Sequence, residues 1–467
     1  MRRLALARSI AAAVALAVST HGRAATFSVD TFLDTIDSNP GDGICADADQ
    51  DCSLRAAIEE SNAMPGADTI ELPAGDFVLS IAGTGEDLGA SGDLDIVDDV
   101  TVIGAGADAT RIDGGGLDRV VDIHAGVAPV TVWFEQLTIR NGALVSTDGM
   151  QSGAGLRIAD SVHVMLDDVV IRDNTATQSF VAIAIETEGC VEGNRLRILD
   201  NRDTAMSGSV SATAAVHVSG ATACLVLTDS EISGNRADEA GAILADAAAP
   251  ITLRRSLISD NEARFAGAML LNSGNDTLLE NVTISGNRGN PGAILNDGGA
   301  HLTLVNSTVT ANGPRADSGC VVGGIQDVHG GYGLTFLSNT VISGNGPGSS
   351  ADDCDAATSV GGGNIIGDSA HCHFSAQPSD QLGVDPELGS LADNGGFTRT
   401  HLPGDAAIDR GEAAACPGSD QRGLSRPIDG DGDGVAACDV GAVEVQRDAI
   451  FADGFEGLTV ERKPIRA

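Results

Sequence analysis

The chain has 467 residues, of which 60 are Gly and only 3% are aromatic, and its formal net charge is −39. So strong a negative charge argues against nucleic acid and anionic lipid as partners, because both are polyanions. The low aromatic content leaves Val, Ile, Leu and Ala to fill the interior. It also weakens any interpretation that needs an aromatic platform for stacking sugars.

Residues 1–24 have the composition of a signal peptide. Arg2, Arg3 and Arg8 give a basic start, residues 9–18 form an apolar segment, and Gly22-Arg23-Ala24 is a small-x-small cleavage site. The apolar segment is too short to span a bilayer, and we expect no transmembrane span elsewhere. Cleavage removes four Arg and changes the net charge from −39 to −43. We therefore expect an exported protein.

The next segment, residues 25–67, contains one predicted helix. Ser53 is a good N-cap residue, Leu54, Ala57 and Ile58 lie on one helical face, and Pro65-Gly66 ends the helix. An amphipathic helix of this kind can cover the open end of a sheet, where unpaired backbone groups would otherwise invite aggregation.

This segment is similar to the CSLREA-type module at the start of exported bacterial β-helix proteins. The similarity rests on Cys52-Ser-Leu-Arg-Ala-Ala-Ile58, Glu60-Ser-Asn62, residues 65–70 and Leu72-Pro-Ala-Gly75. The family pattern has Glu where this chain has Ala56, so the Ser-x-x-Glu capping box is incomplete here. That substitution indicates a structural rather than a catalytic position.

The segment 68–368 contains a short repeat, an apolar pair followed by a polar residue and Asn. Successive Asn positions are separated by 33, 27, 34, 26, 26, 25 and 33 residues. The repeat Asn residues are Asn141, Asn174, Asn201, Asn235, Asn261, Asn287, Asn312 and Asn345. A base period near 26 with three longer intervals is typical of a solenoid whose insertions project as loops.

Each repeat contains short apolar or alternating segments, which is the pattern of strands, and none sustains a helical period. A leucine-rich repeat is the rival at this period, but its Leu-x-x-Leu-x-Leu frame is absent. The pattern predicts an all-β fold, a right-handed parallel β-helix of the pectin-lyase type, with right-handedness following from the bias of parallel crossovers and from the resemblance. Asn235, Asn261 and Asn287, in evenly spaced coils, are predicted to form a ladder at one corner.

Nine cysteines in an exported chain predict four disulfides and one remaining thiol. The close pairs are Cys45 with Cys52, Cys190 with Cys224, Cys354 with Cys372, and Cys416 with Cys438. Cys320 remains, although it could replace either partner of the third pair. A zinc site at Cys354, His371, Cys372 and His373 is the alternative there, but consecutive strand residues face opposite ways.

Residues 369–446 form a predicted irregular, disulfide-containing module. Its similarity to the choice-of-anchor Q module of bacterial surface proteins rests on five motifs in order: Leu391-Ala-Asp-Asn-Gly-Gly-Phe-Thr-Arg-Thr-His401, Ala407-Ile-Asp-Arg-Gly411, Asp420-Gln-Arg-Gly423, Arg426-Pro427 and Asp439-Val-Gly-Ala-Val-Glu444. The resemblance implies the extracellular side or outer-membrane surface of a Gram-negative bacterium. It implies no activity.

Within this module lies a candidate calcium site. Asp429, Asp431 and Asp433 occupy positions 1, 3 and 5 of a loop with Gly434 at position 6, the spacing that wraps oxygen ligands around Ca²⁺. The twelfth position is Val440 instead of Glu, and Asp439 is the candidate replacement. A solvated acidic turn is the alternative. The tail, residues 447–467, contains a Gly-Phe-Glu motif before basic residues, without an intervening apolar span.

The sequence favours a secreted or cell-surface protein used for adhesion or glycan binding, without catalysis. The alternative is a polysaccharide lyase or glycoside hydrolase acting in a groove of the β-helix. Hydrolysis needs clustered carboxylates, and the polygalacturonase-like motifs Asn-Thr-Asp, Gly-Asp-Asp, Gly-His-Gly and Arg-Ile-Lys are absent. Lyase chemistry needs a lone basic residue, for which the candidates are Arg172, Arg195, Arg197, Arg254 and Arg255. A groove with three or more acidic groups beside an Arg or Lys would favour an enzyme.

Overall fold

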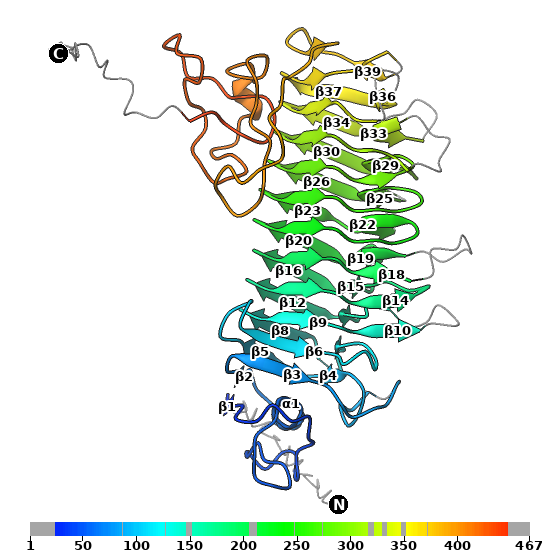
Figure 1. The fold of residues 1–467 in the computed structure, drawn as a ribbon, viewed down its shortest axis with the longest axis vertical. Coiled ribbons are helices and arrows are strands. Elements are labelled where there is room, and N and C mark those ends of the chain that lie inside the picture. Colours follow the sequence, from blue (N-terminus) through cyan, green and yellow to red (C-terminus); the bar gives the residue numbers. More distant parts are fainter. Residues whose placement is uncertain are drawn as a thin grey trace, which may run out of the picture.

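The computed structural model describes residues 24–85, 87–126, 128–145, 152–204, 213–246, 248–272, 274–315, 322–328, 334–346, 352–370 and 372–446. The chain winds into an elongated stack of coils in which every paired strand lies parallel to its neighbours in the stack (Figure 1). The tail, residues 447–467, and Cys320 lie outside these residues, and of the predicted cleavage site only Ala24 is described. No helix among the described residues is both long and apolar enough to cross a membrane.

Three long sheets run along the stack. Sheet A consists of β1 (Thr26–Ser28), β2 (Asp68–Glu71), β5 (Val100–Ile103), β8 (Val130–Glu135), β12 (Val162–Asp167), β16 (Cys190–Asn194), β20 (Cys224–Thr228), β23 (Ile251–Arg254), β26 (Asp276–Glu280), β30 (His301–Val305), β34 (Thr335–Ser338), β37 (Ala356–Gly362) and β39 (His373–Ser375).

Sheet B consists of β3 (Gly75–Val78), β6 (Thr110–Asp113), β9 (Thr138–Arg140), β13 (Val170–Arg172), β17 (Arg197–Leu199), β21 (Glu231–Ser233), β24 (Leu257–Ser259), β27 (Thr283–Ser285), β31 (Thr308–Thr310), β35 (Val341–Ser343), β38 (Ile365–Ile366) and β40 (Gln381–Leu382).

Sheet C consists of β4 (Leu94–Ile96), β7 (Val121–Ile123), β11 (Leu156–Ile158), β15 (Ile183–Ile185), β19 (Ala214–Ser219), β22 (Ala240–Asp246), β25 (Met269–Leu271), β29 (Ile294–Asn296), β33 (Val322–Asp327) and β36 (Asp352–Cys354). Two short sheets lie between B and C, one of β10 (Ala143–Val145), β14 (Thr175–Thr177) and β18 (Arg202–Asp203), the other of β28 (Arg288–Gly289) and β32 (Gly313–Pro314).

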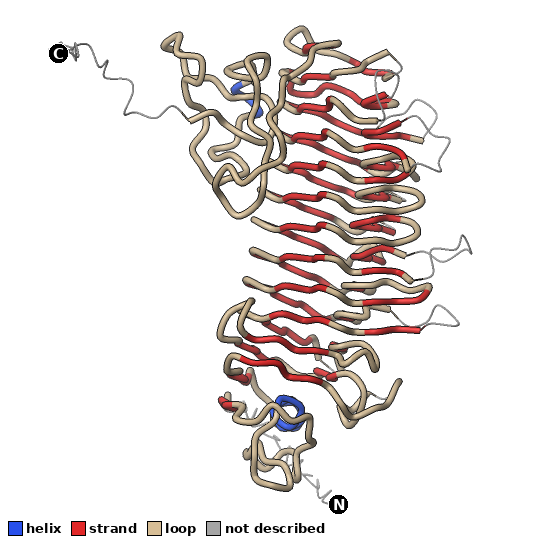
Figure 2. Tube along the Cα trace, viewed as in Figure 1, coloured by secondary structure: helices blue, strands red, loops and turns tan. Residues whose placement is uncertain are grey.

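The strands extend beyond the predicted limits of 68 and 368 at both ends, because β1 adds to sheet A inside the N-terminal segment and β39 and β40 follow residue 368. Helix α1 (Leu54–Ala63) begins where the sequence predicts, with the Ser53 side chain accepting a hydrogen bond from the Ala56 amide. Its apolar face packs into the main core. The helix lies at the N-terminal end of the stack (Figure 2).

The interior is an aliphatic stack. Alternate strand positions point inward, so equivalent residues of successive coils lie over one another, as Ile112, Ile139, Ile171 and Ile198 do in sheet B. Each of these four side chains is at most 1% exposed. The same alternation directs every second side chain of a strand to solvent.

A ladder of buried Asn side chains follows sheet B from coil to coil. The Asn261 carbonyl accepts hydrogen bonds from the backbone and side-chain nitrogens of Asn235, both at 3.0 Å, and Asn261 donates in the same way to Asn287. The ladder runs without a break from Asn174 to Asn345 and ends on the carboxylate of Asp353. Asn141 lies outside it and donates to Asp113.

Four disulfides join the pairs that the sequence spacing suggests: Cys45–Cys52, Cys190–Cys224, Cys354–Cys372 and Cys416–Cys438. Cys190 and Cys224 are direct neighbours on adjacent strands of sheet A. The bond between Cys354 and Cys372 removes both thiolates that the alternative zinc site would need, so that alternative is wrong.

Residues 383–446 form an irregular module, the C-terminal module, which lies against the side of the last coils (Figure 1). It contains the 3₁₀ turn Ala413–Ala415 and isolated antiparallel bridges instead of extended strands. Ala407 and Val440 pack on Val341 and Ile365 of sheet B. The module thereby covers sheet B near the C-terminal end of the stack.

Candidate functional site

Four successive coils place arginines on the outer surface of sheet B. Arg140 and Arg172 are register neighbours on β9 and β13. A second column of register neighbours runs across the same four strands. Arg111 on β6 and Arg197 on β17 are its two ends, and Thr138 and Val170 lie between them. The sequence produces this array because each Arg is adjacent to an inward-pointing Ile.

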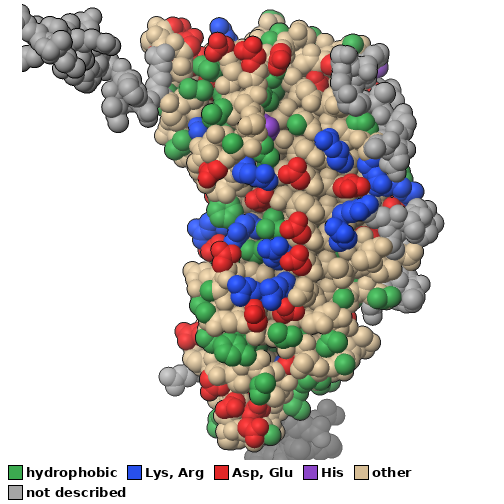
Figure 3. Space-filling model, in the orientation of Figure 1, with side chains coloured by type: hydrophobic (Ala, Val, Ile, Leu, Met, Phe, Trp, Pro, Cys, Tyr) green, Lys and Arg blue, Asp and Glu red, His purple; other side chains and the backbone are tan. Residues whose placement is uncertain are grey.

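These arginines surround a hollow of about 380 Å³, which we name the arginine hollow. Three inter-strand steps of about 4.8 Å separate Arg111 from Arg197. The short side chains of Thr138 and Val170 form the floor between them, and Ala107 and Asp108 line one side. Figure 3 shows basic and acidic side chains gathered between the C-terminal module and the N-terminal end.

Three of the four guanidinium groups have carboxylate partners, while Arg197 does not have a close one. Its Nε is buried without a hydrogen-bond partner, and the group forms no hydrogen bond with any described part of the chain. The nearest carboxylate is Asp108, 3.9 Å away and 97% exposed. The partnered distances are Arg111–Asp76 3.2 Å, Arg140–Asp113 2.8 Å and Arg172–Asp173 2.7 Å.

An unpaired buried N–H is costly, and a guanidinium binds carboxylate or sulfate oxygens through parallel N–H bonds. The geometry of Arg197 therefore suits an anionic ligand group entering the arginine hollow. Arg172 and Arg197 were among the five candidates for the basic residue of a lyase. Each is adjacent to a repeat Ile, Ile171 before Arg172 and Ile198 after Arg197, and this spacing was the available signal that they share one face.

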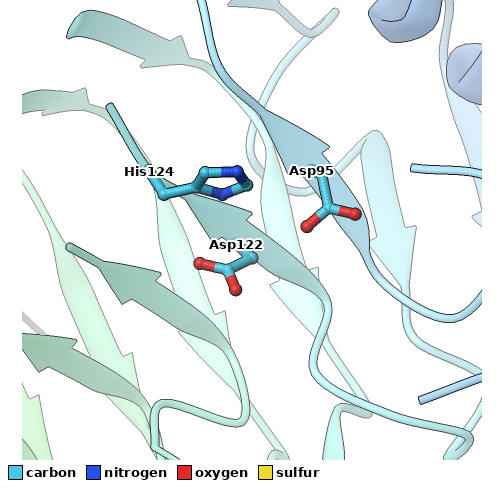
Figure 4. A group of neighbouring side chains, drawn as sticks. All are labelled: Asp95, Asp122 and His124. Carbon is cyan, nitrogen blue, oxygen red and sulfur yellow. The ribbon is translucent and has the colours of Figure 1, made fainter. Parts of the chain in front are cut away.

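A second cluster lies on sheet C, at the N-terminal end of the stack. Asp95 on β4, Asp122 on β7 and His124 just after β7 each offer a ligand atom, and these atoms lie within 4.8 Å of one another (Figure 4). Asp122 accepts hydrogen bonds from Arg119 at 2.7 Å and Arg157 at 2.9 Å. Two guanidinium groups already neutralise this carboxylate, which disfavours a cation there.

Burial shifts the pKa values of acidic groups around this cluster. Burial raises the pKa of Asp93 to about 6, although Arg119, at 2.9 Å, opposes the shift. Burial also raises the pKa of Asp118. Asp93 and Asp122 both bind Arg119, and with Asp95 they are each at most 3% exposed, so this cluster is buried and does not line an open groove. Sequence reasoning missed it, yet Leu94-Asp95-Ile96 and Val121-Asp122-Ile123 recur 27 residues apart, close to the base period.

The calcium motif is assembled differently from the prediction. The oxygens of Asp429 and Asp431 group with Asp409, and all lie within 4.8 Å of one another. Asp433 and Asp439 are not in this group: Asp433 accepts from the Val435 amide, and Asp439 is buried and accepts from the Asp409 and Val445 amides. Asp409 was missed because it lies 20 residues before the loop.

A protein-family model agrees with the fold of the coils. A family model described as a right handed beta helix region matches residues 154–341 and 210–375. The chain is a right-handed parallel β-helix. Among solved structures, pectate lyase Pel9A is similar with a TM-score of 0.43 and 14% identity, covering 90% of this chain and 96% of that one. The Agl-KA catalytic domain has a TM-score of 0.22 and 11% identity, covering 81% and 70%. No curated protein matches the chain.

Proposed function

We propose that this exported protein binds an acidic polysaccharide along the exposed part of sheet B, as an adhesion or glycan-binding protein of the cell surface. The observation that supports the proposal is the arginine hollow, in which the guanidinium of Arg197 has a buried, unpaired Nε. The exposed part of the Arg197 guanidinium, whose side chain is 29% exposed and forms no hydrogen bond with any described part of the chain, would donate to a carboxylate or sulfate on the glycan. The elongated, regularly repeated face suits a polymer better than a small molecule.

The charge of the protein favours a glycan over other polyanions. A net charge of −39 repels densely charged polymers such as nucleic acids. A polysaccharide with one acidic group per one or two sugars can place that group at Arg197. Its hydroxyls can then form hydrogen bonds with the neighbouring arginines and carboxylates. Binding is therefore expected to be selective for the acidic group.

The test is a glycan array followed by calorimetry with polygalacturonate, alginate and hyaluronan, and with neutral dextran as a comparison. Arg197→Ala removes the unpaired guanidinium and should weaken binding about tenfold or more, since a hydrogen bond to a charged group contributes about 1.5–3 kcal/mol. Arg197→Lys keeps the charge but loses the fork and should restore little.

Arg288→Ala is the matched control, because Arg288 is exposed on β28, which does not belong to sheet B, and does not line the arginine hollow. The proposal is wrong if no acidic glycan binds the wild type, or if Arg197→Ala and Arg288→Ala behave alike.

We propose polysaccharide cleavage as the second candidate function, supported by the sheet C cluster. Asp93, whose pKa burial raises to about 6, shares the Arg119 guanidinium with Asp122, and Asp122 lies beside Asp95, so the carboxyl groups of an acid–base pair are present. Incubation with the same glycans and analysis for new reducing ends or unsaturated products tests it. Activity that Asp95→Asn abolishes would support an enzyme, and no product from any bound glycan would count against one.

A further inference from the structure

A second hollow, of about 430 Å³, lies where the C-terminal module meets the corner between sheets A and B. We name it the module hollow. Asn194, Arg195, Asp229 and Arg255 line it from the coils, and Phe397, Ser419, Arg422 and Gly423 line it from the module. Its volume is in the usual range of ligand sites.

The module is attached by a row of corner residues that ends at this hollow. Asn281, Asn306 and Asn339 occupy the same left-handed corner position in three successive coils, and each donates to a module backbone carbonyl. In the preceding coils this position is occupied by Arg255, Asp229 and Arg195. This row of Asn contacts therefore stops where the hollow begins, although Arg399 of the module still binds Glu231 at 3.4 Å and Ser259 at 3.2 Å on sheet B of these coils.

The charges in the module hollow are already balanced, in contrast to Arg197. Arg255 binds both oxygens of Asp229, at 2.8 and 2.7 Å. Arg422 donates to Asp420 at 2.9 and 2.8 Å, and Arg195 to Asp167 at 2.8 Å. With every guanidinium paired, this hollow suits a ligand part that offers hydroxyls rather than charge.

Phe397 adds an aromatic surface to these planar polar groups. Its side chain is 37% exposed and lines the hollow. A sugar ring has an apolar face of C–H groups and a rim of hydroxyls, so it can stack on an aromatic ring while its hydroxyls contact amide, carboxylate and guanidinium groups.

The two hollows are adjacent along the chain and on the fold. Asn194 and Arg195 line the module hollow, and Arg197, two residues later on β17, lines the arginine hollow. The module hollow includes Arg195 of the turn between β16 and β17, and the arginine hollow includes Arg197, the first residue of β17. One oligosaccharide long enough to pass over this turn can occupy both.

We propose that the C-terminal module completes the binding groove, and that Phe397 stacks against a sugar ring of the same polymer whose acidic group binds Arg197. The inference rests on the proposed function, and it assigns the module a direct part in ligand binding.

The test compares full-length wild type and Phe397→Ala with hyaluronan and polygalacturonate oligosaccharides of two to eight sugars. Aromatic stacking predicts that Phe397→Ala weakens the longest oligosaccharides about three- to tenfold and leaves the disaccharides unchanged. Phe397→Tyr should restore affinity. Leu402→Ala is the matched control, because Leu402 is an exposed apolar residue of the module that does not line the hollow.

The two proposals fail in different ways. If the wild type binds no acidic oligosaccharide of any length, the proposed function fails. If the wild type binds and Arg197→Ala weakens binding at all lengths, but Phe397→Ala matches Leu402→Ala at every length, the inference about the module is overturned alone. An equal loss at all lengths in Phe397→Ala would also overturn it, because stacking beyond the arginine hollow requires a longer ligand.

Discussion

Replacing Asn261 with Leu tests whether the Asn ladder stabilises the stack. Asn261 accepts from the backbone and side-chain nitrogens of Asn235 and donates to the Ile232 carbonyl at 2.9 Å and to Asn287 at 3.0 Å. Leu removes all four bonds. The side chain of Asn235 still reaches the Ile198 carbonyl, but its backbone N–H loses its acceptor in a fully buried position.

One orphaned buried donor costs about 1–3 kcal/mol, and the amide neighbours give the new Leu side chain little apolar contact in return. Because each coil contacts only its neighbours, the loss should be concentrated in the coils on either side. We expect a lower thermal unfolding temperature, and faster hydrogen exchange at the Asn235 amide than at amides several coils away.

Asn194→Leu is the control, since Asn194 is exposed and its side chain makes one hydrogen bond, to Asp167 at the surface. The ladder argument would be refuted if the two variants unfolded at the same temperature and the Asn235 amide stayed protected in Asn261→Leu.

Three further predictions concern the two ends of the molecule. Millimolar Ca²⁺ should slow hydrogen exchange in the C-terminal module, because a cation between Asp409, Asp429 and Asp431 relieves the repulsion of their carboxylates. Asp431→Ala should abolish this effect. An equal effect of Ca²⁺ in the variant would show that these residues form an acidic turn and not a calcium site. Burial raises the pKa of Glu444 from 4.5 to about 7, so its contribution is complete below pH 4.5 and is lost as the pH rises through about 7. Intrinsic-rate-corrected exchange in the module should therefore be slower at pH 5.5 than at pH 8, and Glu444→Gln should reduce the difference; an unchanged difference would exclude Glu444 as its source. Ser53→Ala should destabilise the N-terminal helix by about 1 kcal/mol, seen as faster exchange in residues 54–63 alone, and no change there would contradict the cap.

The sequence by itself determined the features that depend on local pattern and repetition. A 26-residue period with recurrent Asn suffices for a parallel stack with a corner ladder, because each coil repeats the same local geometry and buries its apolar positions on the next. Ser53 and Pro65-Gly66 placed the helix because capping involves only near neighbours. The close cysteine pairs are likewise joined across short loops or adjacent coils.

Only the tertiary structure decided which polar side chains share a surface. Arg111 and Arg197 are 86 residues apart in the sequence, yet the strand register places them at the two ends of one column on sheet B. The insertions change the number of residues in each coil, so the sequence spacing alone does not reveal this alignment. Asp409 joins Asp429 and Asp431 through an irregular fold that has no period to extrapolate. Phe397 reaches the coils near Asn194 because the C-terminal module folds back along the stack. Such contacts depend on long-range packing, which local propensity does not encode.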